Sequence, residues 1–403
     1  MKKLLVGLML GTAAATCAAA IGETTTLWKN GERGIAVYRI PALCTAPNGD
    51  LVAACDARKE GGGDLNHAKP INITIRRSSD DGRTWTEAVD SWTWPWNENE
   101  HWAGSDPSFI VDKEAGKIFL FYNVWESVKR HGIFQFYVQE STDNGATWSA
   151  PRDISKDIAF PEWPFGKPDS AGGFIFITSG SGIQTKSGTL LHTLVHVNDG
   201  NALFGSDDHG KTWKPYGKPV KNGDECKVVE LSDGAWMINS RWRGGGRQIH
   251  VTRNGGRSWE GAPRPGGVAR KMLKYEKNER KKHGRQIHVT RNGGRSWESR
   301  YDTVLADPQC NAQIMRYGKF LLFTNCKSPN RRALLHIRAS LDDGQTWTEG
   351  VSLLPPGQEG SAYSDMTILK SGDIGVLYEG GGYATINFVT IPRNEAVAEL
   401  FTK

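Results

Sequence analysis

The sequence predicts an all-β protein, a β-propeller in which small antiparallel sheets repeat around a ring. The main signal is an octet, Ser/Thr-x-Asp/Asn-x-Gly-x-Ser/Thr-Trp, which recurs six times among the 403 residues. Short β-rich runs precede octets, for example Ile71–Arg76, Ile133–Val138 and Ala333–Arg338. Repeating short strands with turn signals between them are typical of radially repeated four-stranded sheets.

The octets share one predicted role, a tight hairpin turn. The Asp or Asn side chain can accept hydrogen bonds from the backbone of its own turn, and the Gly permits a positive φ. The Trp fills the space beneath the turn. We therefore expect the octets to hold turns together and to do no chemistry. They run over Ser78–Trp85, Ser141–Trp148, Ser206–Trp213, Thr252–Trp259, Thr290–Trp297 and Ser340–Trp347.

Further strand-like runs fill the intervals between the octets. They are Lys117–Tyr122, Phe174–Ile177, Thr189–Val195, Ala235–Asn239, Phe320–Thr324 and Ile374–Tyr378.

The charge balance argues against nucleic acid as a partner. The formal net charge is +6, and Gly261–His283 alone holds eight Lys and Arg and two Glu, which accounts for the whole excess. No basic face is therefore expected over the body of the protein.

The amino terminus has the pattern of an export signal. Lys2 and Lys3 precede the apolar run Leu4–Ala15, and cleavage is expected after Ala20. Residues 1–20 are thus predicted to be a signal peptide of a secreted or periplasmic protein, and 21–403 a single propeller domain. No later apolar run is long enough to span a membrane. The remaining cysteines, Cys44, Cys55, Cys226, Cys310 and Cys326, have neither disulfide-framework nor zinc-site spacing, so we expect buried free thiols.

One segment is duplicated. Gly246–Glu260 and Gly284–Glu298 are identical over fifteen positions, at an offset of 38 residues. Two identical hairpin halves cannot both fill one position in a blade. We interpret about 261–298 as a basic insertion, with one copy in the propeller and the rest looping out.

The octet is the Asp box, and together with Tyr38-Arg39-Ile40-Pro41 it makes the chain resemble the bacterial exo-α-sialidases, or neuraminidases. The resemblance extends from about Tyr38 to Phe388 and implies a six-bladed propeller of the sialidase type. Without the duplicate, five Asp boxes remain, which suits six blades of which one lacks the box. The implied activity is retaining hydrolysis of terminal sialic acid from glycoproteins, glycolipids and oligosaccharides through a covalent tyrosyl intermediate.

The resemblance implies a clamp of three arginines for the sialic acid carboxylate. Arg39, Arg241 and Arg332 match the family positions, with the neighbouring Arg331 as the rival for the third. A guanidinium presents a planar donor fork that fits a carboxylate, and it stays charged at any working pH.

The reacting residues implied by the family are Tyr363, Glu225 and Asp64. Tyr363 would be the nucleophile, and Glu225 the base that takes its proton. Asp64 follows three glycines, which would let its loop bring the carboxyl over the leaving oxygen as acid and then base. Asp56 and Glu60 are its competitors.

Four supporting residues also match. Glu379 would orient the first arginine, Asp106 and Arg58 would contact the O4 side of the sugar, and Trp102 would line the N-acetyl pocket. Alternative functions are a trans-sialidase, an intramolecular trans-sialidase or a non-catalytic sialic-acid-binding propeller. We expect a monomer that acts on sialylated glycoconjugates and needs no cofactor or metal.

Overall fold

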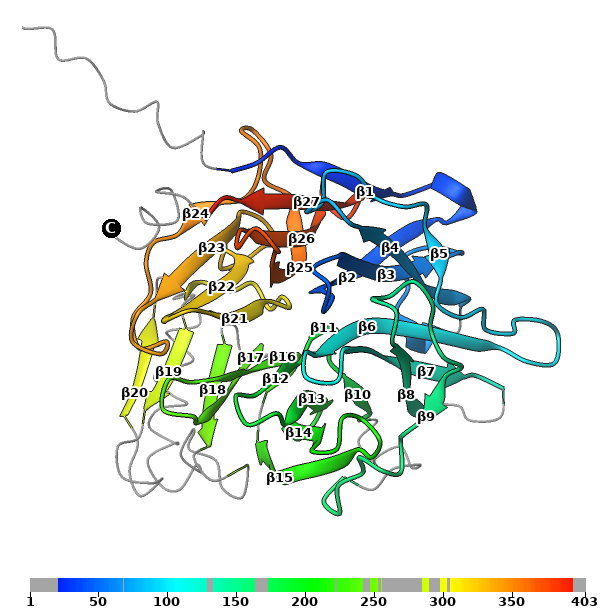
Figure 1. Cartoon of the computed structure of the whole chain (residues 1–403), viewed down its shortest axis with the longest axis horizontal. Coiled ribbons are helices and arrows are strands. Elements are labelled where there is room, and N and C mark those ends of the chain that lie inside the picture. Colours follow the sequence, from blue (N-terminus) through cyan, green and yellow to red (C-terminus); the bar gives the residue numbers. More distant parts are fainter. Residues whose placement is uncertain are drawn as a thin grey trace, which may run out of the picture.

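The computed structural model describes residues 21–67, 69–128, 133–163, 173–221, 223–241, 247–252, 255, 285–289, 298–302 and 305–393. Within these ranges the chain is almost entirely β, apart from two short 3-10 turns, η2 (Glu32–Gly34) and η3 (Leu65–His67). Its sheets are arranged around a centre, as Figure 1 shows. The predicted signal peptide lies outside the described residues.

Five sheets are complete blades of at least four strands, and each predicted run overlaps one of their strands or β17. The first blade is β2 (Val37–Thr45), β3 (Leu51–Arg58), β4 (Ile71–Ser78) and β5 (Val89–Asp90). The second is β6 (Trp102–Asp112), β7 (Lys117–Glu126), β8 (Phe134–Ser141) and β9 (Arg152–Asp153), with β11 (Gly180–Ser181) parallel to β6. The third is β10 (Ile175–Ile177), β13 (Leu190–His196), β14 (Gly200–Ser206) and β15 (Lys214–Lys221), with β12 (Ile183–Gln184) on β13.

The other two complete blades lie at the carboxyl-terminal side of the sequence. One is β21 (Gln313–Tyr317), β22 (Phe320–Cys326), β23 (Leu335–Ser340) and β24 (Val351–Ser352). The last is β25 (Ser361–Ile368), β26 (Ile374–Gly380), β27 (Thr385–Ile391) and β1 (Thr25–Lys29). Because β1 pairs with β27, the two ends of the described chain share one sheet and close the ring.

Where the duplicated segment lies in the sequence, the strands do not form one complete blade. β16 (Cys226–Glu230), β17 (Trp236–Arg241) and β18 (Arg247–Thr252) form a three-stranded sheet, and β19 (Arg285–Val289) pairs with β20 (Glu298–Asp302) in a separate two-stranded sheet. The first copy thus pairs with β17 and the second with β20. The propeller is confirmed, but five complete blades replace the six predicted. Because the duplication repeats the third strand as β18 and β19, the strands here form one sheet of three and one of two. The predicted insertion between the copies lies outside the described residues.

The Asp boxes form the predicted turns wherever they are described in full. In Ser78–Trp85, the Ser78 Oγ accepts a hydrogen bond from the Gly82 N–H at 2.9 Å, and an Asp80 carboxylate oxygen accepts one from the Thr84 N–H at 2.9 Å. Asp81 and Gly82 have φ of 57° and 88°, which explains the glycine. The boxes starting at Ser141, Ser206 and Ser340 repeat these bonds. The two duplicated octets lie largely outside the described residues.

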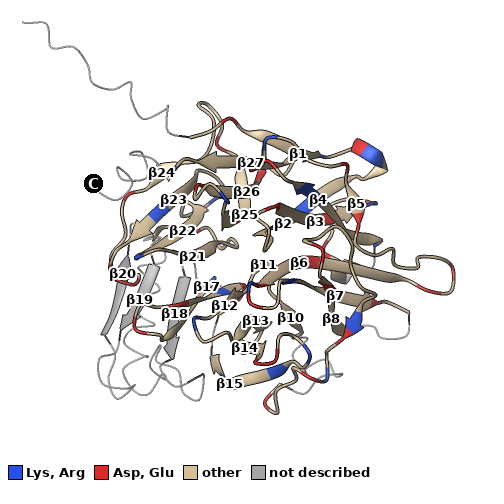
Figure 2. Cartoon of the chain, in the orientation of Figure 1, with Lys and Arg blue, Asp and Glu red and all other residues tan. Residues whose placement is uncertain are grey.

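The cores lie between and within the blades. In the second and third blades, for example, Trp213 of an Asp box packs edge-on against Phe119 and Phe121. The five described cysteines are buried thiols that form no disulfide with one another, as predicted. Acidic and basic residues are interspersed over the described strands and loops in Figure 2. None of the described helices is long and apolar enough to cross a membrane.

Candidate active site

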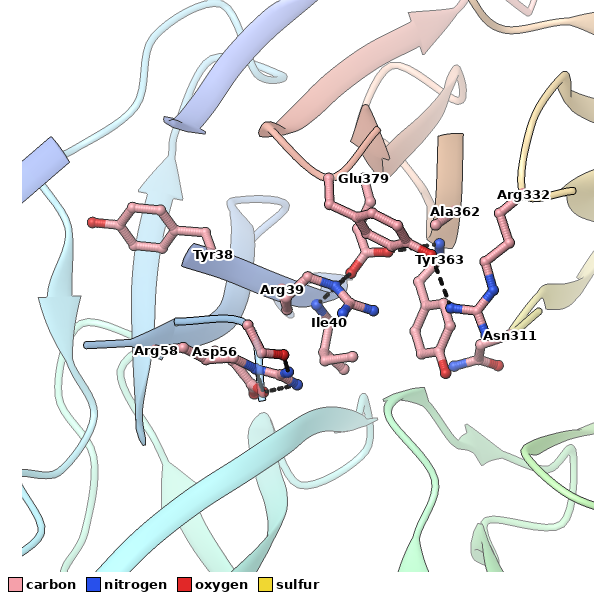
Figure 3. Close-up of polar contacts among 12 residues, drawn as sticks. Tyr38, Arg39, Ile40, Asp56, Arg58, Asn311, Arg332, Ala362, Tyr363 and Glu379 are labelled. Carbon is pink, nitrogen blue, oxygen red and sulfur yellow. Dashed lines mark hydrogen bonds and ion pairs between the residues drawn. The ribbon is translucent and has the colours of Figure 1, made fainter. Parts of the chain in front are cut away.

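Most of the predicted site residues converge at the centre of the ring, from separate blades. Figure 3 shows Arg39, Arg332, Tyr363 and Glu379 around one space, with Arg58 and Asp56 beside it. They come from β2, the loop before β23, β25, β26 and β3. Residues more than 300 positions apart in the sequence therefore meet in one site.

Arg39 is placed by a bulge in β2. Ile40 has φ of 61°, a conformation that a β-branched residue rarely adopts, and the register shifts between Arg39 and Ala42. Arg39 Nε donates to Glu379 Oε1 at 2.6 Å, and the Ile40 N–H donates to the same oxygen at 2.9 Å. The other Glu379 oxygen accepts from the Tyr363 N–H at 3.1 Å. Glu379 thus holds the Arg39 side chain and also ties it to the backbone of Tyr363.

Tyr363 and Glu225 are in direct contact. The phenol donates to Glu225 Oε2 at 2.7 Å, and Arg241 Nη1 donates to that same oxygen at 2.6 Å. The Arg241 N–H donates to the Glu225 carbonyl at 2.8 Å and the Asp224 N–H donates to the Arg241 carbonyl at 2.8 Å, which extends the pairing of β16 with β17 and holds Glu225 beside this arginine. Burial, and then the negative charge of Glu225, raise the pKa of Tyr363 well above its ordinary value, although Arg241 and Arg332 oppose this. The phenol is therefore neutral in the free protein and needs a base to react.

Arg332, and not Arg331, faces the site. Its Nη1 donates to the Tyr383 hydroxyl at 3.1 Å and its Nη2 to the Gln309 carbonyl at 3.0 Å. Its guanidinium carbon lies 5.2 Å from the centre of the Tyr363 ring. Arg331 instead forms an ion pair with Glu359, with side chains 66% and 55% exposed. Burial lowers the pKa of Arg332, but nearby Cys310, Tyr363 and Tyr383 raise it by more, so the guanidinium is charged.

Asp64 lies beside Arg58, which in Figure 3 is separated from Arg332 by Arg39. Arg58 is 1% exposed, and its Nη1 donates to Asp64 Oδ1 at 2.7 Å and to the Gly62 carbonyl at 2.7 Å. Partial desolvation raises the pKa of Asp64, but the charge and hydrogen bond of Arg58 lower it by more. Asp64 is thus ionised in this arrangement.

Asp56 has a role that the sequence did not indicate. It is buried, and its Oδ2 accepts from Arg58 Nη2 at 2.9 Å and from the Ser105 hydroxyl at 2.6 Å. Its Oδ1 accepts from the Asp106 N–H at 3.0 Å. Asp56 therefore anchors both Arg58 and Asp106 and is buried, whereas Asp64 and its other competitor, Glu60, are exposed. The only sequence signal is the spacing of Asp56 and Arg58, which puts them on one face of β3.

Asp106 is held by its backbone and by Asn123. Its φ is 63°, and Asn123 Nδ2 donates to its Oδ2 at 3.1 Å. Burial and the charges of Asp56 and Asp64 raise its pKa well above the ordinary value. Trp102 stacks on Trp94 with ring centres 5.9 Å apart, a contact that leaves its predicted part in an N-acetyl pocket untested.

A buried polar layer lies one step further along the strands of Tyr363 and Glu225. Lys227 and Asp365 follow them by two residues, and a methyl group on Gly180 would lie within 3.5 Å of both side chains. Lys227 Nζ donates to Asn311 Oδ1 at 3.0 Å, and Asp365 Oδ2 accepts from the Leu43 N–H at 2.8 Å. These bonds link the inner strands of several blades beneath the site.

The part of the chain that the structure describes includes no cluster of three or more His, Cys, Asp or Glu that could hold a metal ion. Three guanidinium groups surround one buried phenol, and two of them are already bonded to Glu379 and Glu225. Such a cluster fits a small ligand with one carboxylate.

Comparison with known proteins agrees with the motifs. The family model for the BNR repeat-like domain matches residues 49–272 and 263–376. A sialidase of Micromonospora viridifaciens is 35% identical over 89% of this chain and 52% of its own length, and one of Bacteroides fragilis is 26% identical over 87% and 61%. The chain thus spans between half and two thirds of these curated relatives.

Solved structures show the same fold. The Hadza microbial sialidase Hz136 superimposes with a TM-score of 0.70 at 25% identity, over 91% of this chain and 67% of its own. The chain therefore belongs to the BNR repeat-like family, and it is similar to the bacterial sialidases that its motifs indicate.

Proposed function

We propose that this protein is an exo-α-sialidase that hydrolyses terminal sialic acid with retention, through a covalent bond to Tyr363. The observation that carries the proposal is the 2.7 Å hydrogen bond from the Tyr363 phenol to Glu225, set between Arg39, Arg241 and Arg332. A non-catalytic binding propeller would need the arginines but not this pair.

The choice of a phenol follows from charge. The anomeric carbon of sialic acid carries a carboxylate, so an attacking Asp or Glu would be repelled. A neutral phenol avoids the repulsion but is a weak nucleophile, because its pKa is above neutral. Glu225 can take the proton as the Tyr363 oxygen bonds to the anomeric carbon.

The two halves of the reaction need one group that acts first as an acid and then as a base. As the bond from the anomeric carbon to the leaving oxygen breaks, Asp64 would give that oxygen a proton. It would then take a proton from water, whose oxygen attacks the anomeric carbon and releases Tyr363, and the phenol recovers its proton from Glu225. Asp64 must first leave Arg58, and the Gly61-Gly62-Gly63 loop provides the freedom.

The proposed substrates are sialylated glycoproteins, glycolipids and oligosaccharides, which the predicted export signal at residues 1–20 would let the protein meet outside the cytoplasm.

The test is release of 4-methylumbelliferone from its sialic acid glycoside, between about pH 4 and 8. Tyr363→Phe should lower the rate at least on the order of 100-fold, and Glu225→Gln by about 10²- to 10⁴-fold. Tyr317→Phe, which removes another hydrogen-bonded phenol, is the matched control and should be neutral. Wild-type release no greater than that of Tyr363→Phe would reject the enzyme. NMR of the first-formed anomer would separate retention from inversion.

A further inference from the structure

We infer that Tyr383 is a positioning residue for the carboxylate clamp: its ring supports Arg39 and its hydroxyl orients Arg332. This inference rests on the proposed function, because it assigns the ligand of the two arginines as the sialic acid carboxylate.

Tyr383 contacts two arginines from different blades. The guanidinium carbon of Arg39 lies 4.4 Å from the centre of the Tyr383 ring, within cation–π distance. Arg332 Nη1 donates to the Tyr383 hydroxyl at 3.1 Å. One side chain therefore sets the relative positions of two parts of the clamp.

Of the three arginines, Arg332 relies most on Tyr383 for its orientation. Arg39 is paired with Glu379 and Arg241 with Glu225, so a carboxylate already fixes each of them. The described hydrogen bonds of Arg332 go to the Gln309 carbonyl and to the Tyr383 phenol, neither of them charged. Neutral acceptors hold the fork in place while its positive charge remains available to an anionic ligand.

The backbone at Tyr383 is in an unusual conformation. The β26–β27 turn has positive φ at Gly381, Gly382 and Tyr383, with 76° at the tyrosine. A tyrosine in this region costs about 1–3 kcal/mol, and such residues gather at functional sites when their surroundings hold them there. A glycine at position 383 would avoid the cost but would contact neither arginine.

The surroundings do hold the turn. Asn30 Nδ2 donates to the Tyr383 carbonyl at 2.8 Å, and Asn30 Oδ1 accepts from the N–H of Tyr38, the residue before Arg39. A methyl group on Gly360 would lie 2.7 Å from the Gly382 nitrogen, so the turn also packs closely on the segment leading to Tyr363. Tyr383 is thus fixed relative to Arg39 and to the nucleophile's strand.

The experiment compares Tyr383→Phe, Tyr383→Leu and the control Tyr317→Phe. Free N-acetylneuraminic acid and its methyl ester are used as competitive inhibitors of 4-methylumbelliferone release. Tyr383→Phe should weaken inhibition by the acid about three- to tenfold and raise KM similarly, with kcat within about twofold of wild type. Tyr383→Leu, which also removes the ring, should weaken inhibition by the acid about threefold more than Tyr383→Phe does. Inhibition by the ester, which lacks the anionic group, should change less than about twofold.

A double-mutant cycle separates positioning from general destabilisation. In an Arg332→Lys background, Tyr383→Phe should have little further effect, because the oriented fork is already gone. Additive effects, equal losses for acid and ester, or an unchanged Tyr383→Phe protein would overturn the inference. If the wild type releases no fluorophore, the proposed enzyme fails, and calorimetric titration of free sialic acid still tests Tyr383. Should Tyr383→Leu fail to fold, the isosteric Tyr383→Phe carries the test.

Discussion

Arg58 and Asp64 form an ion pair, with Nη1 and Oδ1 2.7 Å apart, although the Asp64 side chain is 70% exposed. The same arginine is buried on Asp56 and also bonds the Gly62 carbonyl. The free protein therefore keeps the proposed acid ionised and its loop closed onto Arg58. An acid must be protonated before it can act, so this contact should govern the pH dependence of the reaction.

The first prediction concerns that pH dependence. Because Arg58 lowers the pKa of Asp64, this carboxyl is ionised at neutral pH and gains a proton only as the pH falls. We therefore expect kcat/KM for sialyllactose to increase from neutral to acid pH. Arg58→Met should raise the pKa of Asp64 and move the alkaline limb up by about one pH unit, whatever it does to the maximum. Arg77→Met, which breaks an ion pair with Asp50, is the matched control. An alkaline limb that stays in place would contradict the role given to Arg58.

The second prediction concerns the third arginine. Arg332→Lys keeps the charge but loses the planar fork, so KM should rise roughly ten- to a hundredfold, which corresponds to a charge-assisted bond of about 1.5–3 kcal/mol. Arg331→Lys, in the surface pair with Glu359, should be neutral. The reverse result, a loss for Arg331→Lys alone, would show that the register of the clamp is wrong by one residue.

The third prediction concerns an Asp box. Asp143 accepts from the Thr147 N–H at 2.9 Å and from the Ser141 hydroxyl at 2.8 Å, and its bonds with Thr147 lower its pKa to about 2. Asp143→Ala removes these bonds and should reduce the free energy of unfolding in denaturant titrations. The reduction should be only about 1 kcal/mol, because the carboxylate is exposed to solvent. The depressed pKa makes this contribution complete above about pH 4 and lost as pH falls towards about 2. Wild type and variant should therefore converge in stability at low pH, whereas Asp157→Ala should match wild type throughout.

The fourth prediction concerns the duplicated segment. Deleting residues 261–298 removes eleven Lys and Arg and three Glu, which lowers the formal net charge from +6 to −2. Since β18 and β19 have the same sequence, β20 can then pair with β18 and complete the sheet of β16 and β17. We expect the melting temperature and the sialidase activity to be kept or raised. We also expect trypsin to cut the intact protein between Arg264 and Lys282. Unfolding on deletion, or resistance to trypsin, would mean that the segment is packed structure.

Much of the fold could be predicted because its signals are local. The hydrogen bonds that shape the turn of an Asp box join residues within one octet, such as Ser141, Asp143 and Thr147, so the motif dictates its own turn. Alternating short strands between such turns have few alternatives to a propeller. The number of complete blades was not predictable in the same way, because two identical third strands compete for β17 and only the assembled sheets decide which one pairs.

The site depends on contacts between distant residues. The family positions named Arg39, Glu225, Tyr363 and Glu379, but the sequence alone does not say that Tyr363 meets Glu225 across 138 residues or that Glu379 holds Arg39 across 340. The burial of Asp56, the pairing of Asp64 with Arg58 and the position of Tyr383 under Arg39 had no local signal. Turns arise from bonds between near neighbours in the chain, whereas the position of a charged group at the centre of the ring arises only when β1 joins β27 and the blades close around it.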